Sequence, residues 1–402
     1  MSYIQELYQQ FKAFPRTIKF FYGTDILFGF AQAIFSTLFN LHLLAVGFNA
    51  EHIGRLQSVN ALLMAALAIP VGLAADRLGR RWFYVAGSLL FGIPYALMPW
   101  VTSFSALMLL YVASTVGSTM MMVNEAPLLA GEVGADRRAS VFSFMMINFF
   151  VWNTLGIQLA GFLAQWLPAG PLTHYQWPLV IAGVCAVGSG FARSFLPFRE
   201  MPATRGLKLR PTRTAVLLGL VNILAGGFTQ LMTSFGNVIL ANRFGFSPEF
   251  ISTVLTVAGV LGWTGSLLVP WTSRRMGELR GYVLVLALQG LLLGFMGMMT
   301  ASGPFLAGFW GRALLGTMQM SMFSAFAMGV TPESERATAN SYAMLGRNLG
   351  GAASAKLFGT ALAAGNYTTA FTLAGALAIG AAVFTLLAFR RREVFGSDPT
   401  GA

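Results

Sequence analysis

The chain is a succession of long apolar runs separated by short polar or glycine-containing stretches. A helix rises about 1.5 Å per residue, so each run is long enough to cross roughly 30 Å of hydrocarbon. The pattern therefore predicts twelve transmembrane helices. They cover roughly residues 17–45, 52–75, 82–101, 104–131, 138–166, 175–197, 213–242, 249–273, 281–301, 303–331, 337–364 and 367–389.

The longest polar stretch, RSFLPFREMPATRGLKLRPTR at residues 193–213, divides these runs into two sets of six. We therefore predict an all-α integral membrane protein with two six-helix bundles, at residues 1–192 and 214–402, joined by a basic cytoplasmic linker at 193–213. Apolar residues at helical spacing also predict a short amphipathic helix before the first span; these are Ile4, Leu7, Tyr8, Phe11 and Phe14.

The two sets of runs resemble each other at a constant offset of 198 residues. The matching pairs are GFAQ at 29–32 with GFTQ at 227–230, GFNAEHI at 47–53 with GFSPEFI at 245–251, and RASVFSF at 138–144 with RATANSY at 336–342. One such pair would mean little, but the same offset over more than 100 residues indicates an internal repeat. Because equivalent loops carry arginines, we predict parallel repeats related by an axis along the membrane normal.

Composition supports a membrane protein, since 56% of the residues are hydrophobic and only 10% are charged. The net charge of +12 lies in short clusters between apolar runs, a pattern that does not favour nucleic-acid binding. Basic clusters occur in alternate loops, which predicts a multi-pass protein of the cell (inner) membrane with both termini in the cytoplasm. The lone Cys185 indicates neither a disulfide framework nor a metal site, and we expect no cofactor.

One loop, VGLAADRLGRR at residues 71–81, concentrates charge in this apolar chain. Its glycines permit a tight reversal, and Asp76 at a membrane edge can meet a helix N-terminus or an arginine of the other half. The loop's arginines can pair with carboxylates at neighbouring helix ends, for which Glu132 and Asp136 are the candidates.

Twelve spans, a basic linker and this loop together resemble the major facilitator superfamily along essentially the whole chain. The signature loop of that family has Gly, three residues, Asp, Arg, one residue, Gly, then two basic residues. The matching positions here are Gly72, Asp76, Arg77, Gly79, Arg80 and Arg81. The second half keeps Gly277 but has Arg274 in place of the aspartate. The resemblance implies secondary transport by alternating access, with this loop, Glu132 and Asp136 as a conformational latch.

Five ionisable residues are clearly inside predicted spans, where such residues mark transport pathways. Asp25 and Glu125 are candidate proton-binding sites, and the alternative for each is a fixed structural salt bridge. Arg312, Arg347 and Lys356 belong to the second half. They are candidates for ion pairs with those carboxylates or for binding an anionic group of the substrate, and Lys356 has snorkelling to the interface as its alternative.

Polar residues on the helices that line the cavity in the resembled fold are candidate substrate contacts. They are Gln32, Asn124, Asn222, Gln230, Asn237 and Gln319. Methionines recur at equivalent positions of the repeat, Met120 with Met318 and Met122 with Met320, which suits a pocket for varied apolar shapes.

The chain has no phosphate loop of the form GxxxxGK[ST] and no HExxH or GxSxG motif, so we predict neither ATP hydrolysis nor an enzyme. We predict a monomeric, proton-coupled exporter of a hydrophobic or amphipathic small molecule. Residues 153–163, NTLGIQLAGFL, lack the proline of the glycine-proline signature typical of drug and proton antiporters. The alternatives are uptake or exchange of an organic anion and, in a different class, a non-transporting receptor or scaffold.

Overall fold

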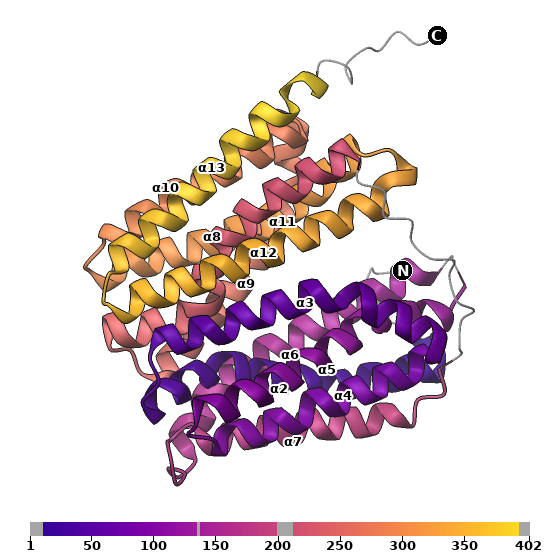
Figure 1. The fold of residues 1–402 in the computed structure, drawn as a ribbon, viewed down its shortest axis with the longest axis vertical. Helices are drawn as coiled ribbons and strands as arrows, with labels where there is room; N and C mark the ends of the chain where they lie inside the picture. Colours follow the sequence, from indigo (N-terminus) through magenta and orange to yellow (C-terminus); the bar gives the residue numbers. More distant parts are fainter. Residues whose placement is uncertain (1–10, 135–136, 199–211, 394–402) are drawn as a thin grey trace. The chain divides into compact units, whose positions relative to one another are not determined.

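The computed structural model describes residues 11–134, 137–198 and 212–393. Within these residues the chain forms twelve long helices and no strand, which confirms the predicted all-α fold (Figure 1). The long helices are α2 (Arg16–Val46), α3 (Ala50–Leu78), α4 (Arg80–Leu97), α5 (Phe104–Gly131), α6 (Arg138–Trp166), α7 (Gln176–Ser194), α8 (Arg213–Phe244), α9 (Pro248–Met276), α10 (Glu278–Met298), α11 (Ser302–Val330), α12 (Arg336–Ala363) and α13 (Tyr367–Glu393). Single turns of 3-10 helix occur at η1 (Met98–Trp100) and η3 (Glu333–Glu335).

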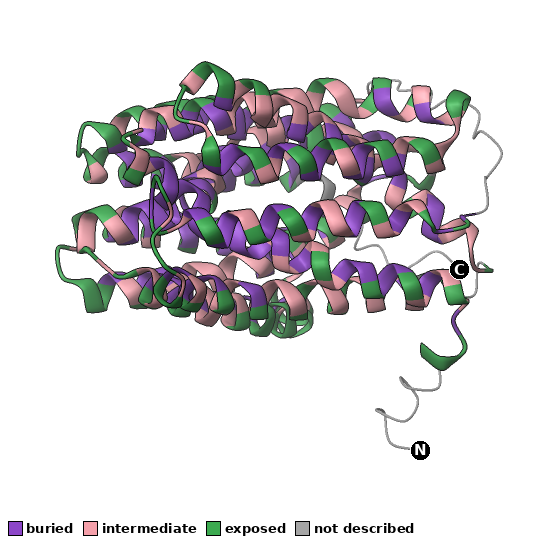
Figure 2. Ribbon diagram, turned by 90° about the horizontal axis from the view of Figure 1, so that it is seen from below, coloured by how far each residue is buried: buried purple, intermediate pink, exposed green. Residues whose placement is uncertain are grey.

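Eleven of these twelve helices are long and apolar enough to cross a membrane. The exception in the described part of the chain is α12, whose sequence is rich in glycine and alanine and includes Arg347 and Lys356. Buried and exposed residues alternate along the helices (Figure 2), and many exposed ones are large and apolar, such as Leu267 and Leu387. Such faces suit contact with lipid tails.

The 198-residue repeat of the sequence also appears in the positions at which helices begin and end. Helices α3 and α9 begin 198 residues apart and end 198 residues apart. The turns that precede and follow them contain Gly47 and Gly245, and Gly79 and Gly277, all with positive φ between 64° and 106°. A left-handed backbone is accessible to glycine at little cost, so the two halves reverse direction by the same device.

The chain divides into two compact units. Unit 1 comprises Met1–Gly47, Ala66–Gly206 and Ser247–Thr253; unit 2 comprises Phe48–Ala65, Leu207–Phe246 and Val254–Ala402. Helices α3 and α9 are therefore each shared between the units.

Small residues allow the helices within each unit to approach closely. In unit 2, a Cβ on Gly346 or Gly350 of α12 would overlap the α8 backbone at Gly219 or Ile223. Close backbone approach of this kind replaces the hydrophobic effect as a source of helix association in lipid. The many small residues of α12 lower its mean hydropathy, and they also allow its backbone to pack closely against α8.

The first ten residues of the predicted amphipathic segment lie outside the described residues. Its last two aromatic residues are described, and Phe11 and Phe14 pack on Tyr22 and Phe144.

Candidate functional site

A buried ion pair joins α2 to α7 inside unit 1. Arg193 Nη2 donates to Asp25 Oδ1 at 2.6 Å, and Arg193 Nε donates to Thr24 Oγ1 at 3.1 Å. The Arg193 side chain is completely buried. Arg193 lies in both the predicted span at 175–197 and the predicted linker at 193–213; α7 continues through Ser194 and carries Arg193 into the bundle.

Three aromatic rings surround the Arg193 guanidinium. Its Cζ lies 5.0 Å from the ring centre of Phe21, 4.9 Å from that of Phe28 and 5.5 Å from that of Tyr84. The negative faces of aromatic rings attract a cation, and the attraction is stronger where water is excluded. The rings therefore offset part of the cost of burying the charge.

Glu125 on α5, the second candidate proton-binding residue, contacts Tyr84. The Tyr84 hydroxyl donates to Glu125 Oε2 at 3.2 Å. Among the described residues no cation lies within salt-bridge distance of Glu125, although Arg193 and Asp25 both interact with it electrostatically. We call Asp25, Glu125, Arg193 and Tyr84 the carboxylate cluster.

Asn148 of α6 completes the surroundings of this cluster. Its Nδ2 donates to the Tyr22 carbonyl at 3.2 Å and to Asp25 Oδ2 at 3.5 Å, and its Oδ1 accepts from Trp152 Nε1 at 3.0 Å. With both carboxylates ionised the cluster carries two negative charges and one positive charge. One proton would make it neutral, which matters in a region from which water is excluded.

The candidate basic residues of the second half, Arg312, Arg347 and Lys356, belong to unit 2. Asp25 pairs with Arg193 of its own unit. Ion pairs between the carboxylates and the bases of the second half stay a prediction. Arg347 lines a cavity of about 270 Å³ in unit 2, together with the predicted substrate contacts Asn222 and Gln319. Arg312 is close enough to Arg347 for the two guanidinium groups to interact electrostatically.

Lys356 lies apart from this cavity. It is nine residues from Arg347 on α12, which places it on the opposite face of a helix with 3.6 residues per turn. Its side chain is exposed and does not line the cavity. Snorkelling, the alternative considered for Lys356, fits this position better than contact with Arg347.

The other candidate substrate contacts have partners inside their own units. Gln32 accepts from the Tyr95 hydroxyl at 3.4 Å, Gln230 donates to Ser234 Oγ at 2.6 Å, and Gln319 accepts from Gln289 Nε2 at 2.8 Å. Asn124 accepts from Arg80 Nη1 at 3.4 Å, so it belongs to the surroundings of the charged loop. Substrate contact by these residues stays a prediction.

The charged loop between α3 and α4 is held together by its own residues. Asp76 forms a salt bridge with Arg80 in the first turn of α4. Arg81 Nη2 donates to the Ser194 carbonyl at the end of α7 at 3.3 Å, and Gly79 takes a positive φ of 102° at the turn. Arg77 is exposed.

Two further features of the loop concern its neighbours. Gly72 faces Val123 of α5, where a Cβ would lie 3.4 Å from Val123 Cγ1. Asp136, predicted as a partner of the loop, lies outside the described residues, and Glu132 lies at the end of α5. The latch role of the loop stays a prediction.

Sequence reasoning missed Arg193, Tyr84 and Asn148 as members of the site in unit 1. The signal for Arg193 was its position inside the apolar run predicted at residues 175–197. Tyr84 and Asn148 gave no signal, because a tyrosine or an asparagine in a span has no preferred partner until the helices pack.

The curated relatives that match this chain are quinolone resistance proteins. NorA of Staphylococcus aureus strain Mu50 is 25% identical over 235 residues, which are 55% of this chain and 58% of that protein, and NorA of strain N315 matches equally. The match thus spans a little over half the length of these relatives.

Solved structures share the fold at low sequence identity. The nucleoside transporter NupG superposes with a TM-score of 0.76 at 14% identity, over 94% of this chain and all of that one. A bacterial homolog of the human lysosomal transporter Spinster gives 0.77 at 13% identity, over 96% of this chain and 98% of that one. A bacterial homologue of the iron transporter ferroportin gives 0.67 at 17% identity, over 94% and 98%.

A family model matches the two halves of the sequence in turn, at residues 22–227 and 217–402. This agrees with the twelve-helix repeat and with the signature loop at residues 71–81. The protein is a multi-pass membrane protein, and the chain belongs to the Major Facilitator Superfamily.

Proposed function

We propose that this protein is a proton-coupled secondary transporter that exports a hydrophobic or amphipathic small molecule by alternating access. It lies in the cell membrane with both termini in the cytoplasm, where the basic loops are placed by the positive-inside rule. The observation that carries the proposal is the carboxylate cluster, in which Asp25 and Glu125 both interact with the buried Arg193.

A cluster with one uncompensated negative charge binds a proton readily in a water-excluded site. When a proton is bound, either carboxylate is neutral and Arg193 balances the other. When the proton leaves, the excess negative charge returns and must be solvated or moved. The protonated and deprotonated cluster can therefore favour different conformations of the transporter. Coupling to a proton gradient requires such a dependence of conformation on protonation.

The substrate class rests on the family and on the lining of the cavity in unit 2. Met320, Phe323 and Met344 line it beside Arg347 and Gln319, so apolar and polar groups converge in one place. Flexible methionines suit ligands of varied shape. The quinolone resistance named for the NorA relatives supports export of an amphipathic molecule.

A flux measurement tests the proposal. Inside-out vesicles made from purified protein and lipid, with an acidic lumen, are expected to accumulate a fluorescent quinolone against its gradient. A protonophore should abolish this accumulation, because it removes the pH difference and leaves the substrate concentration unchanged. Equal accumulation with and without the pH difference would overturn the proton coupling.

The loop at residues 71–81 supplies a second, separate test. Asp76→Asn removes the charge that Arg80 balances, and at this partly exposed position the stability cost is expected to be at most about 1 kcal/mol. If the loop is a latch, Asp76→Asn changes the populations of conformations. Spin labels on the α5–α6 and α11–α12 turns, in protein with Cys185→Ser, report those populations as a distance distribution.

Arg390→Gln is the matched control, since it removes a charge from an exposed position outside the loop, near the end of α13. We expect its distance distribution to match that of the unmodified protein. Identical distributions for Asp76→Asn and the unmodified protein would reject the latch.

A further inference from the structure

Tyr84 and Tyr282 occupy equivalent positions of the repeat, 198 residues apart, and both side chains are fully buried. Tyr84 faces Glu125 and lies against Arg193, in a cluster with an excess of negative charge. Tyr282 faces Arg347 and Gln319. The same position of the repeated scaffold therefore adjoins a negative group in unit 1 and a positive group in unit 2.

The positive group in unit 2 lacks a counter-charge. Within the described residues neither Arg312 nor Arg347 makes a salt bridge, and Arg312 Nε has no acceptor. The hydrogen bond found for Arg312 runs from Nη2 to the Thr229 carbonyl at 3.4 Å. Two guanidinium groups that repel each other within a helix bundle are costly unless an anion joins them.

Two acidic residues of unit 2 have arginine partners of their own. Glu51 pairs with Arg55 at 2.6 Å, and Glu333 pairs with Arg336 at 3.2 Å, both at exposed positions. Glu278 begins α10 and lies beside Gly329 of α11. Within the described residues, neither these carboxylates nor that of Glu335 forms a salt bridge with Arg312 or Arg347, so an anion from outside the chain can supply the counter-charge.

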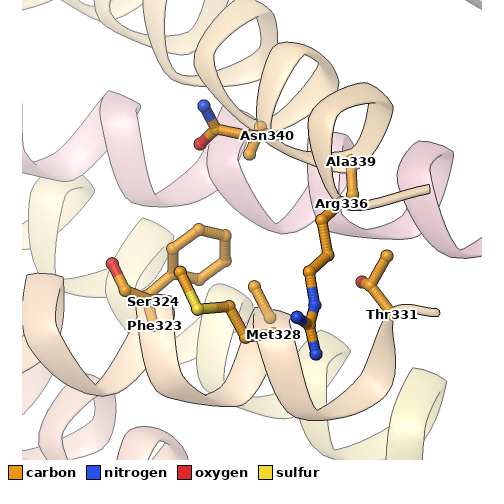
Figure 3. Close-up of a pocket in the computed structure, with 9 residues that line it drawn as sticks. Phe323, Ser324, Met328, Thr331, Arg336, Ala339 and Asn340 are labelled. Atoms are coloured by element: carbon orange, nitrogen blue, oxygen red, sulfur yellow. The ribbon is translucent and has the colours of Figure 1, made fainter. Parts of the chain in front are cut away.

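Two adjoining pockets, which together we call the groove, lie beside α12. The cavity of about 270 Å³ that Arg347 lines shares Phe323, Ser324, Asn340 and Ala343 with a second pocket of about 100 Å³, which reaches Arg336. Figure 3 shows this second pocket, with Arg336 extending from α12 toward Met328 and Thr331. Arg336, Asn340, Ala343 and Arg347 follow one another at spacings of three or four residues, so they share one face of α12.

We propose that this groove binds the anionic group of the transported molecule, a carboxylate, sulfonate or phosphate, beside Arg347, and that Arg312 adds a second positive charge. Gln319 and Asn222 supply amide groups at the cavity wall, and Met320 and Phe323 contact the apolar body. The substrate is thus an amphipathic organic anion. This deepens the proposed transport function and rests on it, because it takes the bound anion to be the cargo.

The size of the cavity agrees with such a ligand. Sites for whole drug-sized molecules enclose roughly 300–1,000 Å³, so about 270 Å³ suits a small aromatic acid or the charged end of a longer amphiphile.

Binding of two isosteric probes tests the proposal. Purified protein in phosphatidylcholine nanodiscs is titrated with 1-naphthoate and with 1-naphthamide, which have similar shapes and differ in charge. We expect 1-naphthoate to bind at least about tenfold more tightly, as a charged hydrogen bond allows. Arg347→Gln should weaken 1-naphthoate binding by about tenfold or more and leave 1-naphthamide binding within about twofold.

Lys356→Gln is the matched control, because it removes one positive charge from the opposite face of the same helix. It should leave binding of both probes unchanged. Arg347→Lys keeps the charge and should retain part of the 1-naphthoate affinity, which separates loss of the site from loss of folding. Equal binding of the two probes to the unmodified protein, or undiminished 1-naphthoate binding to Arg347→Gln, would overturn the proposal.

A second arm identifies the source of the anion. If phosphatidylglycerol in the nanodisc competes with 1-naphthoate in the unmodified protein, a lipid phosphate also enters the groove and the site is confirmed with a lipid-like ligand. If phosphatidylglycerol does not compete and 1-naphthoate still binds, the site is confirmed for a soluble anion.

These titrations use no pH gradient, so their failure is distinct from failure of proton coupling. Loss of gradient-driven quinolone accumulation with intact 1-naphthoate binding would overturn the coupling alone. Intact accumulation with equal binding of the two probes would overturn the anion site alone.

Discussion

Replacing Arg193 with glutamine is expected to lower the free energy of unfolding by about 3–5 kcal/mol, because removal of one partner leaves the other charge of a buried pair uncompensated. Asp25 would lose its 2.6 Å hydrogen bond from the guanidinium, and the aromatic rings of Phe21, Phe28 and Tyr84 would lose the cation that they surround. Thermal and denaturant unfolding of purified protein in nanodiscs measures the effect.

Two comparison variants separate this effect from the general cost of removing an arginine. Arg81→Gln deletes a 3.3 Å hydrogen bond to the Ser194 carbonyl, one residue after Arg193, and should cost about 1 kcal/mol. The double variant Asp25→Asn with Arg193→Gln removes both charges and should recover much of the lost stability. If the double variant is less stable than Arg193→Gln alone, the two residues do not act as a pair.

Glu125→Gln and Asp25→Asn are each expected to abolish uphill transport while leaving substrate exchange intact. Either change removes one of the two carboxylates that share Arg193, so the remaining pair is neutral without a proton. A cluster that no longer gains and loses a proton cannot couple the substrate to a pH gradient. Uphill accumulation in inside-out vesicles should fall to the background level, and counterflow exchange should continue.

Tyr84→Phe is the control for Glu125. It keeps the buried ring beside Arg193 and deletes the hydroxyl that donates to Glu125 Oε2 at 3.2 Å. We expect it to retain uphill transport with a changed dependence on pH, because both carboxylates remain. Preserved uphill transport in both Glu125→Gln and Asp25→Asn would exclude the carboxylate cluster from the coupling mechanism.

Much of the fold could be predicted from the sequence, because helix length and helix ends are local properties. Apolar runs long enough to span a bilayer predicted the helices, and the turn glycines Gly79 and Gly277 mark equivalent helix starts. The sequence also predicts α12 as a span. Its glycine and alanine content and its charged residues lower its mean hydropathy, so it is not among the eleven helices that are apolar enough to cross a membrane.

The candidate site could be predicted only in part. Asp25 and Glu125 were singled out because an ionisable residue in a span is costly, but the cost says nothing about which partner offsets it. The predicted span at 175–197 and the predicted linker at 193–213 both include Arg193, and Asn124 is a candidate substrate contact because it is polar. The packing of α7 against α2 and of α4 against α5 gave them other partners.

The sequence by itself determined that this is a twelve-helix membrane protein of repeated halves with the signature loop of its family, since each of these features depends on residues that are neighbours along the chain or repeat at a fixed offset. Only the tertiary structure decided that Asp25 pairs with Arg193, 168 residues away, and that Arg347 lines a cavity together with Asn222 and Gln319. The reason is physical. A buried charge is balanced by the groups that helix packing brings within a few ångströms of it. Small residues allow helices to pack closely, but they do not specify which helix is the partner.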